Sequence, residues 1–159
     1  MIRPMRFLQT SDWQLGLAIK QLGEKALRAR EQRLETAQRT MDLAKEEGVE
    51  FVVLAGDTFD SHEIDNLVVE RAVEILSTVA DRPVFVLPGN HDPLVAGGVW
   101  ERRAWQRRAE NVIPLDEAVE IPLADGSALY PCPLTQKRSR RDPTDWIPSR
   151  ATGDDRVRV

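Results

Sequence analysis

Three short apolar runs, separated by helix-like segments, constrain the fold of this chain more than any other feature of its sequence. The runs are Phe7–Ser11, Phe51–Ala55 and Val84–Leu87. Each reads as a strand, and the segments between them place apolar residues at helical spacing. An alternation of strand and helix predicts right-handed crossovers and a mostly parallel sheet that helices cover. We therefore expect an α/β fold.

Two amphipathic segments are the predicted helices between these strands. The first spans about Glu24 to Glu47 and stops at Gly48, and the second spans about Asp65 to Ala80. Asp65 or Asn66 would cap the second helix by accepting a hydrogen bond from its first turn. The residues expected to be buried are Leu27, Leu34, Ala37, Met41 and Ala44 in the first helix, and Val68, Ala72, Ile75, Leu76 and Val79 in the second.

The remainder of the chain has shorter predicted elements. A short helix is expected over about Val99 to Ala109. Extended pieces are expected at Asn111–Pro114, Ala118–Pro122 and Ser127–Tyr130. The turn residues Ala124–Gly126 join the last two pieces, which predicts a hairpin. Residues 133–155 are rich in Pro, Arg, Asp and Ser and are expected to form a loop, whereas the alternation in Arg156–Val159 predicts the beginning of another strand.

The composition is that of an ordinary globular domain. The 159 residues include 42% hydrophobic and 30% charged residues, and this length suits one core rather than two. No apolar run approaches the roughly 20 residues of a membrane span, and the N-terminus has no signal-peptide core. Cys132 is the single cysteine, which excludes an internal disulfide. We expect a cytoplasmic protein that does not associate with a membrane.

Polar residues follow each apolar run at its carboxyl end. Asp12 follows the first run, Asp57 the second, and Asn90 and His91 the third. Ligands of open parallel sheets gather beyond the carboxyl ends of the strands, so we expect these side chains to meet. Hydrolysis of a phosphodiester can use two divalent ions roughly 3.5–4 Å apart. Asp57 would bridge the two ions, Asp12 would serve one and Asn90 the other.

His91 and Asp92 would complete the predicted catalytic group. His91, free of the metal, would donate a proton to the leaving oxygen. Asp92 would hydrogen-bond the imidazole and keep it charged. The structural alternative is that Asp12 and the Gly56–Asp57 pair are ordinary turn residues, because aspartate after a strand commonly has that role.

Three segments resemble the first three blocks of the calcineurin-like metallophosphoesterases: Phe-Leu-Gln-Thr-Ser-Asp-Trp-Gln-Leu-Gly from Phe7, Gly-Asp-Thr-Phe-Asp from Gly56 and Pro-Gly-Asn-His-Asp from Pro88. They are most similar to the DNA-repair nuclease branch typified by bacterial SbcD, over roughly the first 100 residues. The resemblance implies a layered metallophosphoesterase sheet flanked by helices. It also implies Mn²⁺-dependent hydrolysis of phosphodiesters, usually in DNA.

The resemblance assigns Asp12 and Asp57 to a first Mn²⁺ and Asp57 and Asn90 to a second. It makes His91 the residue that stabilises the transition state or protonates the leaving oxygen. The family has a histidine two residues after the first aspartate, where this chain has Gln14. A glutamine carbonyl is a poorer ligand for Mn²⁺ than imidazole, so we expect the first ion to bind weakly.

Later blocks of the family supply further histidines, whereas this chain contains only His62 and His91, and His62 is expected to be an exposed loop residue. We therefore interpret residues 1–159 as the N-terminal part of a longer nuclease domain or as a natural remnant, without the second half of the core. Little nuclease activity is expected from this part alone. The segment that binds an SbcC-like ATPase in the family would also be missing. Asp60 would either orient the metal ligands or cap its loop.

Two groups of basic residues lie outside the motifs. They are Arg102, Arg103, Arg107 and Arg108, and further on Lys137, Arg138, Arg140 and Arg141. Because Trp100 and Trp105 interleave with the first group, it suits DNA phosphates and unpaired bases. The alternative is that the tryptophans pack in the core, the arginines are solvated and the second group lies in a mobile loop. The net charge of −4 does not itself indicate nucleic acid.

Two other functions remain open on the sequence. One is hydrolysis of a small phosphodiester or phosphate monoester. The other is a non-catalytic assembly module, in which the helices at Asp65–Ala80 and Val99–Ala109 would pair two copies of the chain as a homodimer.

Overall fold

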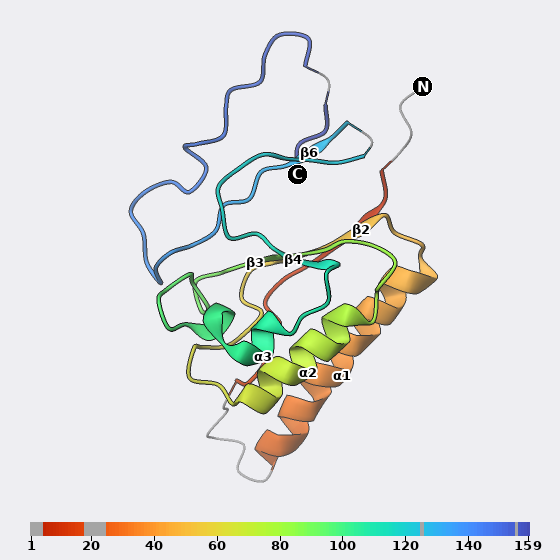
Figure 1. Cartoon of the computed structure of the whole chain (residues 1–159), viewed down its shortest axis with the longest axis vertical. Helices are drawn as coiled ribbons and strands as arrows, with labels where there is room; N and C mark the ends of the chain where they lie inside the picture. Colours follow the sequence, from red (N-terminus) through yellow and green to blue (C-terminus); the bar gives the residue numbers. More distant parts are fainter. Residues whose placement is uncertain (1–4, 18–24, 125, 155) are drawn as a thin grey trace.

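The structure is a computed structural model that describes residues 5–17, 25–124, 126–154 and 156–159 (Figure 1). Its elements follow the chain in the order β1 (Phe7–Thr10), α1 (Lys25–Glu46), β2 (Phe51–Ala55), α2 (Asn66–Ser77), β3 (Val84–Leu87), η2 (Val99–Glu101), α3 (Arg103–Gln106), β4 (Val112–Pro114), β5 (Ile121–Pro122) and β6 (Ala128–Leu129). The predicted α/β class is confirmed. Glu24, the predicted start of the first helix, lies outside the described residues.

The main sheet has four parallel strands in the order β1-β2-β3-β4. Phe7 pairs with Phe51 across the first strand pair, and Val84 pairs with Val52 on one side and Val112 on the other. Because alternate residues of a strand point to opposite faces, β2 and β3 supply two cores. Val52, Leu54, Val84 and Val86 pack with the helices, whereas Phe51, Val53 and Phe85 pack beneath the β5–β6 hairpin. The helices and the hairpin thus lie on opposite faces of the sheet (Figure 1).

The helices keep their predicted positions with some changes in burial. The side chain of Asp65 caps α2 by accepting a hydrogen bond from the backbone nitrogen of Leu67 at 3.0 Å, as predicted. Val69 of α2 is fully buried, whereas Val68 is only partly covered. Leu27 was predicted to be buried but is 70% exposed, because the buried residues of α1 all lie in its second half.

The helix predicted over Val99 to Ala109 is wrong in two respects, because it is interrupted at Arg102 and ends at Gln106. Arg102 has an extended backbone, with φ −65° and ψ 142°, and separates η2 from α3. Its guanidinium donates hydrogen bonds to the carbonyl oxygens of Ile64, at 2.7 Å, and of His62. These contacts hold Arg102 against the loop before α2, where a continuing helix would not place it.

The C-terminal third forms a second, smaller layer over the sheet. The predicted hairpin is confirmed, since β5 and β6 pair antiparallel. The strand predicted to begin at Arg156 is only a single parallel bridge between Arg158 and Ala128 of β6. Ala128 donates a backbone hydrogen bond to Val157 at 3.0 Å, and Val159 donates one to Ala128 at 2.9 Å. Residues 133–154 contain turns and bends but no helix or strand. Within the described ranges, no helix has the length and apolar character that crossing a bilayer requires.

Candidate metal-binding site

The loops after β1 and β2 lie side by side because strand pairing continues into them. Asp12 donates a backbone hydrogen bond to Gly56 at 3.2 Å, and Gln14 donates one to Asp57 at 2.9 Å. Leu15 then forms a parallel bridge with Phe59. These backbone contacts carry the two aspartates past the last sheet residues in a fixed relative position.

Three residues in these loops have a left-handed backbone. Asp12, Gln14 and Asp57 have φ values of 56°, 44° and 53°, and they are the only non-glycine residues with positive φ in the described part of the chain. Such conformations cost free energy and persist where surrounding contacts enforce them, which is commonly at functional sites. The backbone hydrogen bonds of all three loop positions supply that enforcement here.

The loop after β3 fits closely against Asp57. The backbone nitrogen of His91 donates a hydrogen bond to Asp57 Oδ1 at 2.9 Å. A Cβ atom added at Gly89 would overlap the carboxylate and the backbone nitrogen of Asp57. Only glycine at position 89 therefore permits the loop after β3 to lie so close to Asp57. The close fit and the hydrogen bond from His91 fix the orientation of the Asp57 side chain.

Asp12, Asp57 and Asn90 line one cavity of about 310 Å³ beyond the ends of β1, β2 and β3. Its wall is completed by Ala55, Gly56, Leu87, Pro88, Gly89, Cys132, Leu134 and Pro143. The structure thus brings three of the four predicted metal ligands together. Gln14 is half-buried beside them but is not part of this wall, so its predicted place as a ligand has no support in the geometry.

The donors around this cavity suit one hard cation better than two. Two carboxylates and an amide oxygen are the ligand types that Mg²⁺, Ca²⁺ and Mn²⁺ prefer. However, no group of three or more His, Cys, Asp or Glu side chains in the described ranges is placed to hold a metal ion. Asp57 Oδ1 is also already engaged by the amide of His91. The residues present fit a partial site for a single divalent ion.

The ring of His91 is oriented by Asp60. Its Nδ1 atom lies 2.9 Å from the Asp60 carbonyl oxygen and 3.7 Å from the Asp60 Oδ1 atom. A carbonyl oxygen only accepts hydrogen bonds, so Nδ1 bears the hydrogen and Nε2 is the nitrogen left for chemistry. The side chain of His91 is 32% exposed. These contacts make Asp60, the last residue of the Gly-Asp-Thr-Phe-Asp segment, the residue that positions the imidazole of His91.

The predicted pairing of Asp92 with His91 is wrong. The Asp92 side chain is fully buried, and its two oxygens accept hydrogen bonds from the backbone nitrogens of Phe59, at 2.9 Å, and Gly89, at 2.7 Å. Burial raises the pKa of Asp92 to about 6, although the two amide hydrogen bonds oppose that shift. Asp92 therefore ties the loops after β2 and β3 together, and its predicted catalytic role has no contact to support it.

His62 is not the exposed loop residue that the sequence predicted. It is half-buried, and its Nδ1 atom accepts a hydrogen bond from the backbone nitrogen of Val99 at 3.2 Å. Its Nε2 atom is buried without a partner. Burial lowers the pKa of His62, and the positive charge of Arg102 lowers it further. His62 thus fastens the loop after β2 to η2 in its neutral form.

The first group of arginines lies elsewhere and has mixed roles. Arg102, Arg103 and Arg107 line a separate cavity of about 480 Å³, which also includes Ile64, Asn66, Glu70 and Ala104. Arg102 is committed to backbone carbonyls, whereas Arg103 and Arg107 are exposed. Arg108 lies over the Trp105 ring, 5.5 Å from its centroid.

The tryptophans among these arginines belong to the core. Trp100 and Trp105 are 7% and 1% exposed, and both rings pack against Phe59. Their rings contact each other edge to face, with centroids 4.7 Å apart. Neither ring offers a face on which a nucleic-acid base could stack. Of the predicted DNA binding by this group of arginines, only the contacts with phosphates therefore stay a prediction.

The geometry agrees with what comparison with known proteins finds. A family model described as calcineurin-like phosphoesterase matches residues 5–150. The SbcD subunit of the nuclease SbcCD from Bacillus subtilis (strain 168) is 36% identical over 94 residues, an alignment that covers 55% of this chain and 22% of that relative. The chain thus aligns with only about a fifth of that relative's length. Since the family model matches most of the sequence and its motif residues meet at one cavity, this chain belongs to the calcineurin-like phosphoesterase family.

Proposed function

We propose that this chain is part of a metal-dependent phosphodiester hydrolase that cleaves DNA, in the cytoplasm and in the service of DNA repair. The observation that carries the proposal is the meeting of Asp12, Asp57 and Asn90 around one cavity at the ends of three parallel strands. Membership of a phosphoesterase family and similarity to one component of a nuclease support the reaction class. Like that relative, the protein would act together with a partner chain.

Asp12, Asp57 and Asn90 would hold a divalent cation, and Mn²⁺ is the ion that we propose. When bound, the cation would supply neutralisation of phosphate charge and activation of water. The strained backbone at Asp12 and Asp57 and the Gly89 contact hold the carboxylates ready for this role, so little reorganisation accompanies binding.

His91 would act as the general acid. The Asp60 carbonyl fixes the hydrogen on Nδ1, so an imidazolium at His91 presents its second proton on Nε2. Transfer of that proton to the leaving oxygen would complete cleavage of the phosphorus–oxygen bond. Asp92 would act indirectly, because it holds together the loops on which Asp57 and His91 lie.

Weak metal binding and low turnover are expected from the 159 residues alone. In the described part of the chain, three oxygen-bearing side chains line the cavity, and Gln14 stands where the family has histidine. Fewer ligands mean lower affinity, and the second ion of a two-metal mechanism has no evident site among them.

Titration calorimetry with Mn²⁺ and hydrolysis of a duplex oligonucleotide test the proposal together. Asp57→Asn should abolish the binding heat and the hydrolysis, whereas Asp116→Asn, a matched change at an exposed position, should alter neither. His91→Ala should lower turnover while leaving Mn²⁺ binding intact. Mn²⁺ binding that survives Asp57→Asn would contradict the assigned site. Hydrolysis of bis(p-nitrophenyl) phosphate without any cleavage of DNA would instead identify a small-molecule phosphodiesterase.

A further inference from the structure

Residues 133–154, here called the strap, cross the wall of the candidate metal cavity. Leu134 and Pro143 both line the cavity, next to Asp12, Asp57 and Asn90. The carbonyl oxygen of Leu134 accepts a hydrogen bond at 2.7 Å from the backbone nitrogen of Leu94. In Figure 1 the chain descends from the hairpin toward the loop after β3, and the blue strap then rises to the top of the view before it returns toward the C-terminus. The strap is therefore fixed to the same loop that supplies Asn90 and His91.

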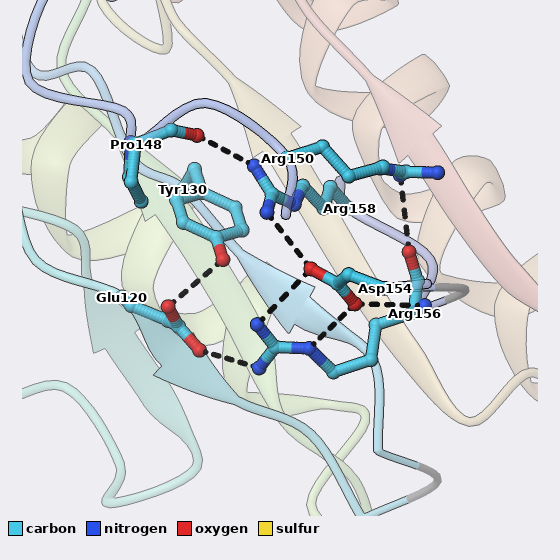
Figure 2. A network of polar contacts seen from close by, with 7 residues as sticks. All are labelled: Glu120, Tyr130, Pro148, Arg150, Asp154, Arg156 and Arg158. Carbon is cyan, nitrogen blue, oxygen red and sulfur yellow. Dashed lines mark hydrogen bonds and ion pairs between the residues drawn. The ribbon is translucent and has the colours of Figure 1, made fainter. Parts of the chain in front are cut away.

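The far end of the strap is fastened to the hairpin. The Trp146 ring lies 5.8 Å from the ring of Tyr130. Arg158 donates a hydrogen bond to the Pro148 carbonyl at 2.7 Å and one to Asp154 at 2.9 Å (Figure 2). Arg156 joins Asp154 to Glu120 in the same network. Both ends of the strap thus have defined anchors.

The middle of the strap presents positive charge without partners. Residues 135–142 are all exposed. They include Lys137, Arg138, Arg140 and Arg141, here called the cationic tip, and one carboxylate, Asp142. That carboxylate accepts hydrogen bonds from the backbone nitrogen and hydroxyl of Thr144. Over the described ranges, none of the four cations lies within ion-pair distance of a carboxylate.

This lack of partners distinguishes the tip from other arginines of the same layer. Arg156 and Arg158, a few residues further along, are both paired with Asp154. The whole chain has a net charge of −4, so four adjacent free cations form a local exception. A polyanion would be attracted to this surface, because each cation that meets a phosphate releases condensed counterions.

We propose that the cationic tip binds backbone phosphates of a DNA strand that enters the cavity, and that it thereby selects a polymer over a small phosphodiester. The inference rests on the proposed function, which supplies DNA as the polyanion. Pro143 lines the cavity and adjoins the tip in sequence, so phosphates flanking the one at Asp57 would meet these cations. A small diester has no flanking phosphate and would not gain from them.

Fluorescence anisotropy with a labelled 30-base-pair duplex in EDTA tests the tip without any need for metal or turnover. The test variant changes Lys137, Arg138, Arg140 and Arg141 to Gln. The matched control changes Lys25, Arg28, Arg30 and Arg39 to Gln, which are four exposed cations of α1 that form no ion pair among the described residues. Both variants have the same net charge, so a difference between their DNA affinities shows that the position of the removed cations matters.

The slope of the logarithm of affinity against the logarithm of salt concentration should become shallower by about 3.6 in the tip variant, if all four cations meet phosphates. This corresponds to about 100-fold less loss of affinity between 50 and 200 mM salt. The α1 control should keep the wild-type slope. The double change Arg140→Gln with Arg141→Gln should give about half of the effect, and thermal melting should be unchanged because these side chains are exposed.

Equal slopes in the tip variant and the α1 control would overturn the inference, as would a slope that responds only to Arg103→Gln with Arg107→Gln. Absence of any DNA binding by the wild-type chain would overturn it too. These outcomes are separate from failure of the proposed function, which shows as loss of Mn²⁺ binding or hydrolysis. Asp57→Asn should leave the binding slope in EDTA unchanged, and the tip variant should still hydrolyse bis(p-nitrophenyl) phosphate at the wild-type rate.

Discussion

The motif loops and the C-terminal cluster are both dense in hydrogen bonds, but they are held by different kinds of contact. The motif loops are residues 11–17, 56–62 and 88–92, and their central bonds join the buried Asp92 carboxylate to backbone amides. The C-terminal cluster consists of the seven residues of Figure 2, which exchange bonds mainly between arginine and carboxylate side chains. Its side chains differ in exposure, since Arg156 is 49% exposed but Asp154 and Arg158 are only 12% and 17% exposed.

This difference explains where a precise geometry can be kept. A buried group that loses its partner has no water to replace it, so each broken bond costs about 1–3 kcal/mol. Exposed ion pairs are screened by water and salt, and their loss is partly compensated by solvent. Of the residues proposed for catalysis, Asp57 is buried and lies in the first kind of environment, whereas Asp12 and Asn90 are exposed. The ion pairs of Arg156 lie in the second kind.

The largest effect on stability is expected from Gly89→Ala, which disrupts the tightest contact of the motif loops. The added methyl group would overlap the Asp57 carboxylate and backbone nitrogen, so either β3 or the Asp57 loop must shift. Overpacking of this kind costs about 3 kcal/mol. Urea unfolding should show that loss, and calorimetry should show no Mn²⁺ binding even where the variant is folded.

Gly97→Ala is the matched control for this change. Gly97 has a φ of 71° and no atom within 4 Å of an added Cβ, so the variant meets backbone strain but no clash. It should lose about 1 kcal/mol and keep the metal site. Equal losses in the two variants would mean that the fit of Gly89 against Asp57 does not hold the motif loops.

The motif loops also separate what the sequence could predict from what it could not. The strands Phe51–Ala55 and Val84–Leu87 were predicted with their observed bounds, because continuous apolar runs mark strands that are covered on both faces. The convergence of Asp12, Asp57 and Asn90 follows from that topology. The long-range partner of Asp92 could not be predicted, since it is the backbone amide of Phe59 in another loop and depends on no side-chain pattern.

The interruption of the helix predicted over Val99 to Ala109 also depends on contacts that the sequence does not reveal. The spacing of Val99 to Ala109 suits a helix, and nothing local signals a break at Arg102. The break depends on carbonyl oxygens at His62 and Ile64, nearly 40 residues earlier in the chain. Contacts of backbone carbonyls with a remote side chain leave no periodic trace in a sequence, and the burial of His62 was missed for the same reason.

A pH-dependent effect of intermediate size is expected at His62, which joins the motif loops to η2. Burial lowers its pKa below the ordinary value of 6.5, so the neutral ring is favoured in the folded chain. Its contribution to stability is therefore full above about pH 6.5 and is lost as the pH falls through the lowered pKa. The urea midpoint of the wild type should fall more between pH 7.5 and 5.0 than that of His62→Gln, which accepts a hydrogen bond but does not titrate.

The comparison with His62→Gln isolates this group from its neighbours. Arg102 is the charged residue that faces it, and it remains positive throughout the range. Asp92, whose pKa is raised, titrates nearby with the opposite sign but is present in both proteins. Parallel pH profiles for the two proteins would show that His62 is not held neutral by its surroundings.

The smallest effect on global stability is expected from Asp154→Asn in the C-terminal cluster. Hydrogen bonds from Arg156 and then Arg158 hold the pKa of Asp154 well below its usual range, so these contacts persist above pH 4 and weaken only in stronger acid. Loss of the charge should loosen the bridge between residues 156–159 and β6 while the main sheet is unaffected. Hydrogen exchange at neutral pH should therefore quicken several-fold at the amides of Ala128 and Tyr130, which are bonded to Val157 and Val159, and stay unchanged at Val52 and Val84. Faster exchange at all four positions would show that the two regions unfold as one unit, and that the cluster stabilises the motif loops after all.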